Sequence, residues 1–184
     1  MEVNKNQIWR KLYSPSDSRE DSRMADVELI LRLFAFSYLR QMEEINAKQI
    51  NLVRYLNNFM KKNKDFGLIS KEECIFIFTS LMDFFSKAFD GNLFRNGKQE
   101  ETGFTFARRI NPAIFDSVCS ATVFCLKTGK LHDFNDINLM GKYKQLLEEL
   151  NYQRVISQRT TNIDNIKERI KIAALILYGI NYEW

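Results

Sequence analysis

Few residues of this sequence have the type and spacing that catalysis or metal binding requires. The chain contains one histidine, His132, and three cysteines, Cys74, Cys119 and Cys125, which lie six or more residues apart within apolar stretches. A structural zinc site needs four closely spaced Cys or His ligands, and a catalytic Ser or Cys needs a histidine beside it. The sequence therefore predicts neither a metal site nor a nucleophilic active site.

Motifs for phosphate binding and for acid–base catalysis are also missing. The 7 glycines are isolated, and neither the G-x-x-x-x-G-K-[ST] nor the G-x-G-x-x-G pattern occurs. Two acidic pairs, Glu148/Glu149 and Asp133/Asp136, are the remaining candidates for an independent enzyme. Adjacent carboxylates on a helix surface usually face solvent. We therefore expect no catalysis by the chain on its own, and no cofactor.

Charged and amide side chains that interrupt apolar stretches are more informative. They crowd the start of the first long predicted helix and flank a glycine-bearing segment: Arg23, Asp26, Glu28, Arg32, Arg95 and Asn111. Within this set, Glu28 and Arg32 are spaced for an ion pair along one helix face. A buried arginine must be paired, because an unpaired buried charge is strongly destabilising. Two interpretations follow: a structural ion-pair network that ties the loop to the helix, or a polar face that contacts a partner.

A second group of residues has the chemistry to contact DNA phosphates: Lys61, Lys62, Lys64, Arg108 and Arg109. Basic residues in the last turn of a helix are also explained by the helix dipole. The net charge is +4, from 27 Lys and Arg against 23 Asp and Glu, well short of a concentrated basic patch. DNA is therefore a candidate partner, and a stand-alone helical nucleic-acid-binding module is the alternative function.

The elements that position these residues are predicted to be helices. The 15 Phe and 7 Tyr need burial, while 2 Pro and 7 Gly leave few sites for turns. We predict an all-α fold, an irregular bundle of six to seven helices with at most one very short strand or hairpin. Residues 1–22 are expected to form a short helix and a loop, and residues 23–184 a single helical domain.

Apolar residues spaced three and four apart set the predicted helix ranges. The helices are expected at residues 24–41, 47–62, 70–89, 111–129, 134–151 and 162–180, with a short helix around residues 8–12. Ser70 and Glu73 form a capping-box pattern, and Asn111-Pro112 is a strong start signal. Residues 91–103 are predicted to be a loop, and residues 102–110 are the one place where a short strand fits.

The sequence carries no signal for a membrane or for secretion. The first 25 residues are polar, and the longest apolar stretches fall far short of the ~20 residues that span a bilayer. Three cysteines are an odd number, and their apolar surroundings are typical of buried thiols in a reducing compartment. We therefore expect a cytoplasmic protein without membrane contact.

Five stretches resemble, in order and spacing, the helical half of the GmrSD-type restriction endonuclease N-terminal domain. They are residues 23–36 (R-x-x-D-x-E-L-I-L-R-x-F-A-F), 55–60 (Y-L-N-x-F-M), 94–95 (F-R), 111–116 (N-x-A-I-F-D) and 169–170 (R-I). The resemblance covers roughly residues 8–175. It implies a helical fold and a role in the restriction of modified phage DNA.

The same resemblance implies that catalysis lies outside this sequence. Family members carry an amino-terminal ParB/sulfiredoxin-like subdomain whose Asp-Gly-Gln-Gln-Arg motif is tied to nucleotide hydrolysis, and many add a carboxy-terminal His-Asn-His nuclease. Here Asp90-Gly91-Asn92 is not followed by Gln-Gln-Arg, so the motif is absent. We therefore expect a fragment, a split-gene product or a trimmed relative. Its role would be a non-catalytic helical scaffold and partner-docking part of a GmrSD-like, modification-dependent restriction system in anti-phage defence. Its partner would be another protein or the missing N-terminal subdomain, and an uncovered apolar patch would support docking.

Overall fold

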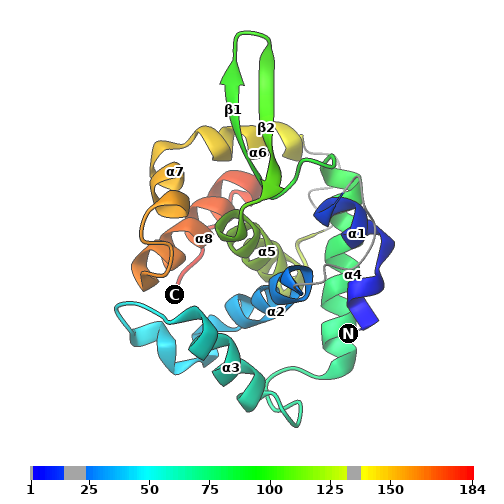
Figure 1. Cartoon of the computed structure of the whole chain (residues 1–184), viewed down its shortest axis with the longest axis vertical. Coiled ribbons are helices and arrows are strands. Elements are labelled where there is room, and N and C mark those ends of the chain that lie inside the picture. Colours follow the sequence, from blue (N-terminus) through cyan, green and yellow to red (C-terminus); the bar gives the residue numbers. More distant parts are fainter. Residues whose placement is uncertain (1, 15–23, 132–137) are drawn as a thin grey trace.

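Helices make up most of the computed structural model, which describes residues 2–14, 24–131 and 138–184 (Figure 1). The described α-helices are α1 (Gln7–Tyr13), α2 (Ala25–Ser37), α3 (Leu52–Lys62), α4 (Lys71–Ala88), α5 (Pro112–Lys127), α6 (Leu139–Glu148), α7 (Leu150–Ser157) and α8 (Ile163–Tyr178). Three short 3-10 helices are η1 (Glu2–Lys5), η2 (Leu39–Gln41) and η3 (Glu43–Asn46). Strands β1 (Arg95–Glu100) and β2 (Gly103–Ile110) form an antiparallel hairpin. The helical class is confirmed, with eight described α-helices in place of the expected six to seven.

Helix α5 forms the centre of the fold. In Figure 1 it lies between α2, α4 and α8, and every residue from Ala113 to Val123 is buried. The predicted start is confirmed, because the Asn111 side chain accepts a hydrogen bond from the Ala113 amide and Pro112 occupies the first helical position. None of the described helices is long and apolar enough to cross a membrane.

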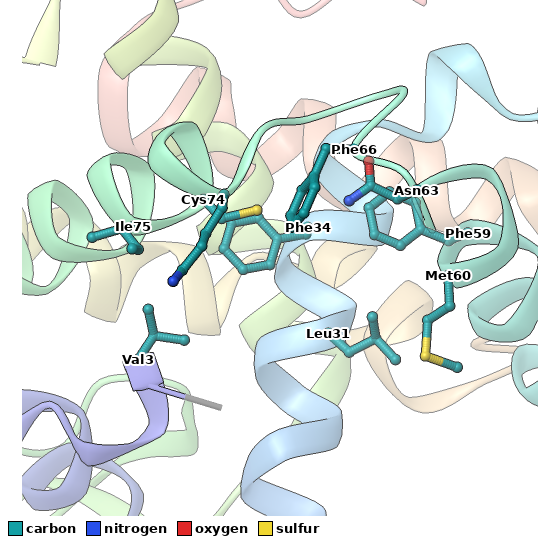
Figure 2. A pocket seen from close by; sticks show the side chains of 10 residues that line it. Val3, Leu31, Phe34, Phe59, Met60, Asn63, Phe66, Cys74 and Ile75 are labelled. Atoms are coloured by element: carbon teal, nitrogen blue, oxygen red, sulfur yellow. The ribbon is translucent and has the colours of Figure 1, made fainter.

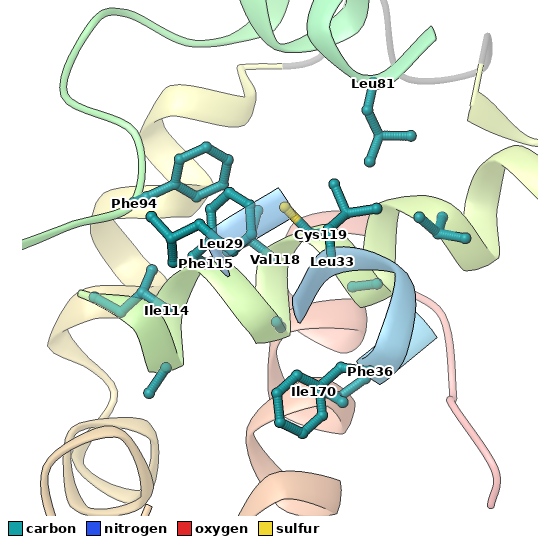
Figure 3. Close-up of a cluster of buried hydrophobic side chains, with 14 of the residues drawn as sticks. Leu29, Leu33, Phe36, Leu81, Phe94, Ile114, Phe115, Val118, Cys119 and Ile170 are labelled. Carbon is teal, nitrogen blue, oxygen red and sulfur yellow. The ribbon is translucent and has the colours of Figure 1, made fainter. Parts of the chain in front are cut away.

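The apolar core is one cluster to which almost every element contributes. Figure 3 shows the part where α2, α4, α5 and α8 meet, with the labelled side chains Leu29, Leu33, Phe36, Leu81, Ile114, Phe115, Val118, Cys119 and Ile170. Trp9 of α1 belongs to the same cluster, with its ring centroid 5.7 Å from that of Phe115 and 6.3 Å from that of Phe78. Helix α1 therefore packs into the core of residues 24–184, and residues 15–22 of the expected loop lie outside the described residues.

The hairpin corrects one prediction. Residues 91–103 were expected to be a loop, but Arg95–Glu100 form strand β1, paired with β2 in the segment where a strand was thought to fit. The sequence of β1, R-N-G-K-Q-E, lacks the apolar alternation that predicts a strand, so the pairing depends on its partner. A Cβ atom on Gly97 would lie 2.3 Å from the Phe104 ring, which explains the glycine. The hairpin projects from the helical body in Figure 1.

Two predicted helices begin or end elsewhere, the first because a distant segment pairs with its backbone and the second because a local 3-10 turn takes over. The helix predicted at 47–62 begins at Leu52, since the Ile50 amide donates to the Thr161 carbonyl at 2.9 Å and the Ile163 amide donates to the Lys48 carbonyl at 3.2 Å. The helix predicted at 24–41 ends at Ser37 and continues as the 3-10 turn η2. Local spacing alone does not reveal either boundary.

The helix predicted at 134–151 is confirmed from Leu139 to Glu148 but is interrupted at Glu149. Helix α6 ends at Glu148, Glu149 adopts an extended conformation, and the unpredicted helix α7 follows. The break allows α7 to bury Tyr152, whose hydroxyl lies 2.7 Å from the Ser117 hydroxyl of α5. Residues 134–137 lie outside the described residues.

The capping box before α4 forms only in part. The Ser70 hydroxyl accepts from the Glu73 amide at 3.0 Å, as predicted. The Glu73 carboxylate does not reach back to Ser70; it accepts a 2.6 Å hydrogen bond from the Tyr38 hydroxyl and lies 3.2 Å from the Lys127 ammonium group. A tertiary contact between α2, α4 and α5 therefore replaces the second half of the local cap.

Candidate functional site

Asp26, at the start of α2, lies in a buried polar cluster. Its carboxylate accepts hydrogen bonds from the Arg10 guanidinium at 2.5 Å and from the Asn4 amide at 3.1 Å. Asn4 in turn accepts a hydrogen bond from the Trp9 indole N–H at 3.0 Å. The cluster fastens η1 and α1 to α2, and Asp26 is fully buried within it.

A second buried cluster joins α2, α5 and α8. Asp116 accepts from Arg32 through Nε at 3.0 Å and Nη2 at 2.6 Å, and from Arg169 through Nη2 at 3.1 Å. Arg169 also donates to the Thr160 carbonyl at 2.7 Å, and Glu28 lies 3.5 Å from Arg32, so the predicted ion pair is present. Burial lowers the pKa of Arg169 against the opposing charge of Asp116. Burial also acts to lower the pKa of Arg32, but Asp116 and Glu28 outweigh it and raise that pKa.

Arg95 is buried at the base of the hairpin. It donates to four backbone carbonyls, those of Gly91 (2.8 Å), Leu93 (3.0 Å), Leu12 (2.8 Å) and Arg108 (3.2 Å). Burial lowers the pKa of this guanidinium. The side chain therefore fixes the hairpin to the end of α1 and is turned away from solvent.

The six polar residues that the sequence singled out do not form one outward face in the described structure. Asp26, Arg32 and Arg95 are buried in the contacts above, which are those expected of an internal network. Asn111 caps α5 and donates to the Asn96 side chain at 3.0 Å. Glu28 is exposed, and Arg23 lies outside the described residues. The charged groups closest to the core therefore serve its cohesion.

The predicted phosphate contacts are exposed but not assembled into one patch. Lys61 and Lys62 are the last two residues of α3 and Lys64 follows it, while Arg108 and Arg109 lie on β2. Figure 1 places the hairpin and α3 at opposite ends of the molecule. No single duplex contact is favoured by this arrangement.

The described residues do not bring potential catalytic groups together. Among residues 2–14, 24–131 and 138–184, no group of three His, Cys, Asp or Glu side chains could hold a metal ion. Burial raises the pKa of Cys74 to about 11 and that of Cys125 to about 12, and it raises the pKa of Cys119 well above its usual range. All three thiols are therefore neutral near pH 7. Glu148 is exposed and Glu149 caps α7, while His132, Asp133 and Asp136 lie outside the described residues.

The most distinctive surface feature is an open apolar pocket of about 460 Å³, which we call the α3 groove (Figure 2). Its lining residues come from η1, α2, α3, the loop after α3 and α4: Val3, Leu31, Phe34, Phe59, Met60, Asn63, Phe66, Lys71, Cys74 and Ile75. Figure 2 shows Leu31 and Met60 near one another, with Val3 and Ile75 across the pocket. Met60 remains 48% exposed and Phe66 54% exposed. Eight of these ten residues are hydrophobic, so the groove is an uncovered apolar surface.

The loop that carries Phe66 is held in an unusual conformation. Phe66 has φ 56°, a left-handed value that large side chains rarely adopt. The Asn63 side chain stabilises the loop by accepting from the Leu68 amide at 3.1 Å and from the Ile69 amide at 2.9 Å. Backbone strain of this kind tends to be retained at functional positions. Here it keeps a large aromatic side chain at the edge of the groove.

The buried face of α3 differs in part from the one that its sequence pattern predicts. The spacing of the apolar residues predicts burial of Ile50, Val53, Leu56 and Met60. Ile50 and Leu56 are buried, but Val53 and Met60 are 70% and 48% exposed, and Tyr55 and Phe59 pack inward instead. Large apolar residues lie on two sides of this helix. Because only one side packs on the core, such a pattern indicates that the other side is an exposed apolar surface. The buried Asp116 and Arg169 were not singled out as site residues either, although each interrupts an otherwise apolar helix face.

Comparison of the chain with family models, with curated proteins and with solved structures finds no match.

Proposed function

We propose that this chain is a non-catalytic docking module whose α3 groove holds one helix of a partner protein, as the helical scaffold of a GmrSD-like, modification-dependent restriction system. The observation that carries the docking role is the groove itself, an apolar pocket of about 460 Å³ that leaves Met60 and Phe66 about half exposed. Contiguous exposed apolar surface marks interaction sites on otherwise soluble proteins. A groove of this kind typically receives the apolar face of a helix.

The charges around the groove favour an acidic partner helix. Lys61, Lys62 and Lys64 are exposed within four residues of Met60, and Lys71 lines the groove. These four lysines outnumber the exposed acidic neighbours of the lining residues, Asp65 and Glu72. Lys62 lies 3.5 Å from Glu43, but exposed pairs of this length contribute little. Complementary charge speeds association and selects partners. The occupant is therefore an amphipathic helix with apolar residues on one face and Asp or Glu along its edges.

The restriction-system part of the proposal is supported by the residues that carry the sequence resemblance. Arg32, Asp116 and Arg169 each belong to a different resembling stretch, far apart in the chain. In the fold their side chains form one buried cluster. A buried cluster of this kind requires its polar residues at fixed places on the three helices. Chains with the same helical scaffold would therefore share the order and spacing of these residues.

The docking role is tested with a designed peptide. The probe is a fluorescent amphipathic helix of about 15 residues with Leu and Phe at helical spacing and Glu at its edges, and its counterpart carries Lys in place of Glu. Fluorescence anisotropy with the full chain should give at least roughly tenfold tighter binding of the acidic peptide, a difference of about 1.4 kcal/mol. Equal affinity for the two peptides, or no binding, contradicts the proposal.

A matched pair of variants locates the binding. The double variant Met60→Ser/Phe66→Ser removes exposed apolar side chains from the groove, and Val53→Ser/Leu150→Ser removes two that do not line it. Only the first should abolish binding of the acidic peptide, with both variants folded by circular dichroism. If sedimentation instead shows a dimer that Met60→Ser/Phe66→Ser dissociates, the occupant is a second copy of this chain and the partner helix is wrong.

The restriction setting has its own test. A neighbouring reading frame that encodes an Asp-Gly-Gln-Gln-Arg domain should yield a product that binds the purified chain, and Met60→Ser/Phe66→Ser should weaken that complex. A neighbourhood without such a frame, or a product that does not bind, rejects the restriction assignment. The peptide experiment would still decide the docking role.

A further inference from the structure

A second pocket, of about 200 Å³, lies where α2, α5 and α8 meet. None of its lining residues belongs to the α3 groove. Three helix N-termini border it: Ile50 and Leu52 flank the cap of α3, Asn111–Ala113 begin α5, and Thr160 and Thr161 precede the cap of α8. Helix N-termini carry partial positive charge and attract anions. The starts of three helices therefore lie at the edge of the pocket.

Two arginines add positive charge at the pocket. Arg32 and Arg169 both line the pocket, and none of its described lining residues is acidic. The two guanidinium groups share one buried carboxylate, that of Asp116. Glu28 lies 3.5 Å from Arg32, but its side chain is 53% exposed and therefore screened by water. The buried part of the cluster is left with an excess of positive charge beside the pocket.

Arg169 supplies an observation that is independent of the helix ends. Its side chain is 1% exposed, and its Nε has no hydrogen-bond partner among the described residues. The two arginines have about ten N–H donors between them, yet they donate four hydrogen bonds to described residues. An unsatisfied buried donor is unfavourable and rare. Arg169 therefore keeps a buried donor for which the described residues supply no acceptor.

We infer that this pocket binds the phosphate group of a small molecule. Arginine side chains recognise phosphate through the hydrogen bonds that their planar groups donate, and an anion offsets the excess positive charge. The Phe36 ring holds both guanidinium groups in place, 5.7 Å from the Arg32 Cζ and 5.9 Å from the Arg169 Cζ. Asn111 also lines a neighbouring groove of about 450 Å³. The inference does not rest on the docking role of the α3 groove.

The experiment titrates the full chain with inorganic phosphate and follows the arginine side chains by ¹⁵N–¹H correlation spectroscopy of their Nε–H groups. Chloride at the same ionic strength is the control for charge screening, and acetate is the control for a carboxylate ligand. The Nε–H signals of Arg32 and Arg169 should shift and saturate with phosphate, and the thermal midpoint should rise. Neither change should appear with chloride or acetate.

Two variants place the binding in this pocket. Arg169→Lys keeps the charge but loses the planar donor set, so the phosphate affinity should fall at least tenfold, with circular dichroism checking the fold. Glu28→Gln removes the exposed carboxylate near Arg32, so the phosphate affinity should rise by roughly threefold. Glu148→Gln, an exposed glutamate at the end of α6, should leave the affinity unchanged. Poor folding cannot imitate the gain expected of Glu28→Gln.

Several results would overturn the inference. A shift of the Nε–H signals that grows without saturation, or equally in chloride, means that phosphate acts only as background salt. Saturation by acetate with the affinity of phosphate rejects the phosphate class. Unchanged affinity in both Arg169→Lys and Glu28→Gln places any binding elsewhere on the protein. The site is established if phosphate shifts the Nε–H signals of both arginines, and if Arg169→Lys lowers the phosphate affinity while Glu28→Gln raises it.

Discussion

Helix α5 and helix α3 solve the same packing problem in opposite ways. Every residue of α5 from Ala113 to Val123 is buried, so the one charged side chain there, Asp116, must be fully paired. Helix α3 buries only Tyr55, Leu56 and Phe59 among its eleven residues and leaves Val53 and Met60 in water. The centre of the molecule therefore hides charge, while its edge exposes apolar surface.

This reversal changes where interaction should be sought. On an ordinary surface, charged side chains face solvent and apolar ones are buried. Here Asp26, Arg32 and Arg95 face inward, so their contribution is to cohesion. The exposed apolar residues around α3 have no such internal role. The contrast assigns cohesion to the charges of the centre, beside the phosphate binding inferred for Arg32 and Arg169, and docking of a partner protein to the apolar edge. Each prediction tests one side of that division.

The largest expected effect comes from breaking the central charge cluster. Asp116→Leu leaves Arg32 and Arg169 without their shared carboxylate, and loss of one partner from a buried ion pair costs about 3–5 kcal/mol. Urea denaturation of the variant and of the parent measures the difference. As a control, Asp83→Ala removes an exposed aspartate of α4 and should change the unfolding free energy by less than about 0.5 kcal/mol.

A triple variant sharpens the same point. Replacing Arg32, Asp116 and Arg169 together with Met, Leu and Met removes every charge of the cluster, and buried ion pairs often tolerate such exchange. The triple variant should therefore be more stable than Asp116→Leu alone. If it is less stable than the single variant, the arginines contribute through packing and carbonyl contacts rather than through their pairing with Asp116.

A smaller effect separates the two helices within the folded state. Helix α3 is attached along one side, so its amides should exchange with solvent through local opening, while those of α5 should exchange only on global unfolding. Asn51→Ala removes the α3 cap, in which the Asn51 side chain accepts from the Arg54 amide, and should lower α3 protection by about 1 kcal/mol.

Hydrogen exchange read by mass spectrometry or NMR resolves the two helices. Protection of α5 should be the same in Asn51→Ala as in the parent, because the cap is local to α3. Equal loss of protection in both helices would show that α3 unfolds together with the core. In that case the edge would not be an independent unit, and the contrast drawn above would fail.

Much of the helical framework could be predicted because its signals are local. Ser70 before α4, Asn111-Pro112 before α5 and Asn162 before α8 each accept hydrogen bonds from the first turn, as their side chains allow. The elements that escaped prediction depend on distant partners. Strand β1 exists because β2 pairs with it, and α3 starts late because residues 48–50 pair with residues 161–163.

The candidate sites were less predictable than the helices, for the same reason. Arg32 could be recognised as a charge within an apolar helix, but its partner Asp116 is 84 residues away and nothing local connects them. The α3 groove could not be predicted without knowing which of the two apolar sides of α3 is buried. Tyr55 settles that question, because its hydroxyl donates to the Ala35 carbonyl of α2 and turns Met60 toward solvent.

The smallest expected effect concerns Glu73, where α4 joins α2 and α5. The hydrogen bond donated by the Tyr38 hydroxyl lowers the pKa of Glu73, against burial and with help from Lys127. A carboxyl whose pKa is lowered by folding stabilises the protein above its ordinary pKa of about 4.3, and that stabilisation is lost as the pH falls through the folded value. Glu73→Gln should therefore lower the thermal midpoint slightly at pH 7, and the difference from the parent should shrink as the pH is lowered toward 3.

The pH profile distinguishes this pairing from a simple loss of charge. Tyr38 keeps its proton throughout this range, since burial and Glu73 raise its pKa, so only the carboxyl titrates within the contact. Glu72→Gln, on the exposed neighbour, should run parallel to the parent from pH 7 to pH 3. A gap between parent and Glu73→Gln that does not shrink toward pH 3 would mean that the side chain acts through its shape. The contact would then belong with the packing of the centre rather than with the screened charges of the edge.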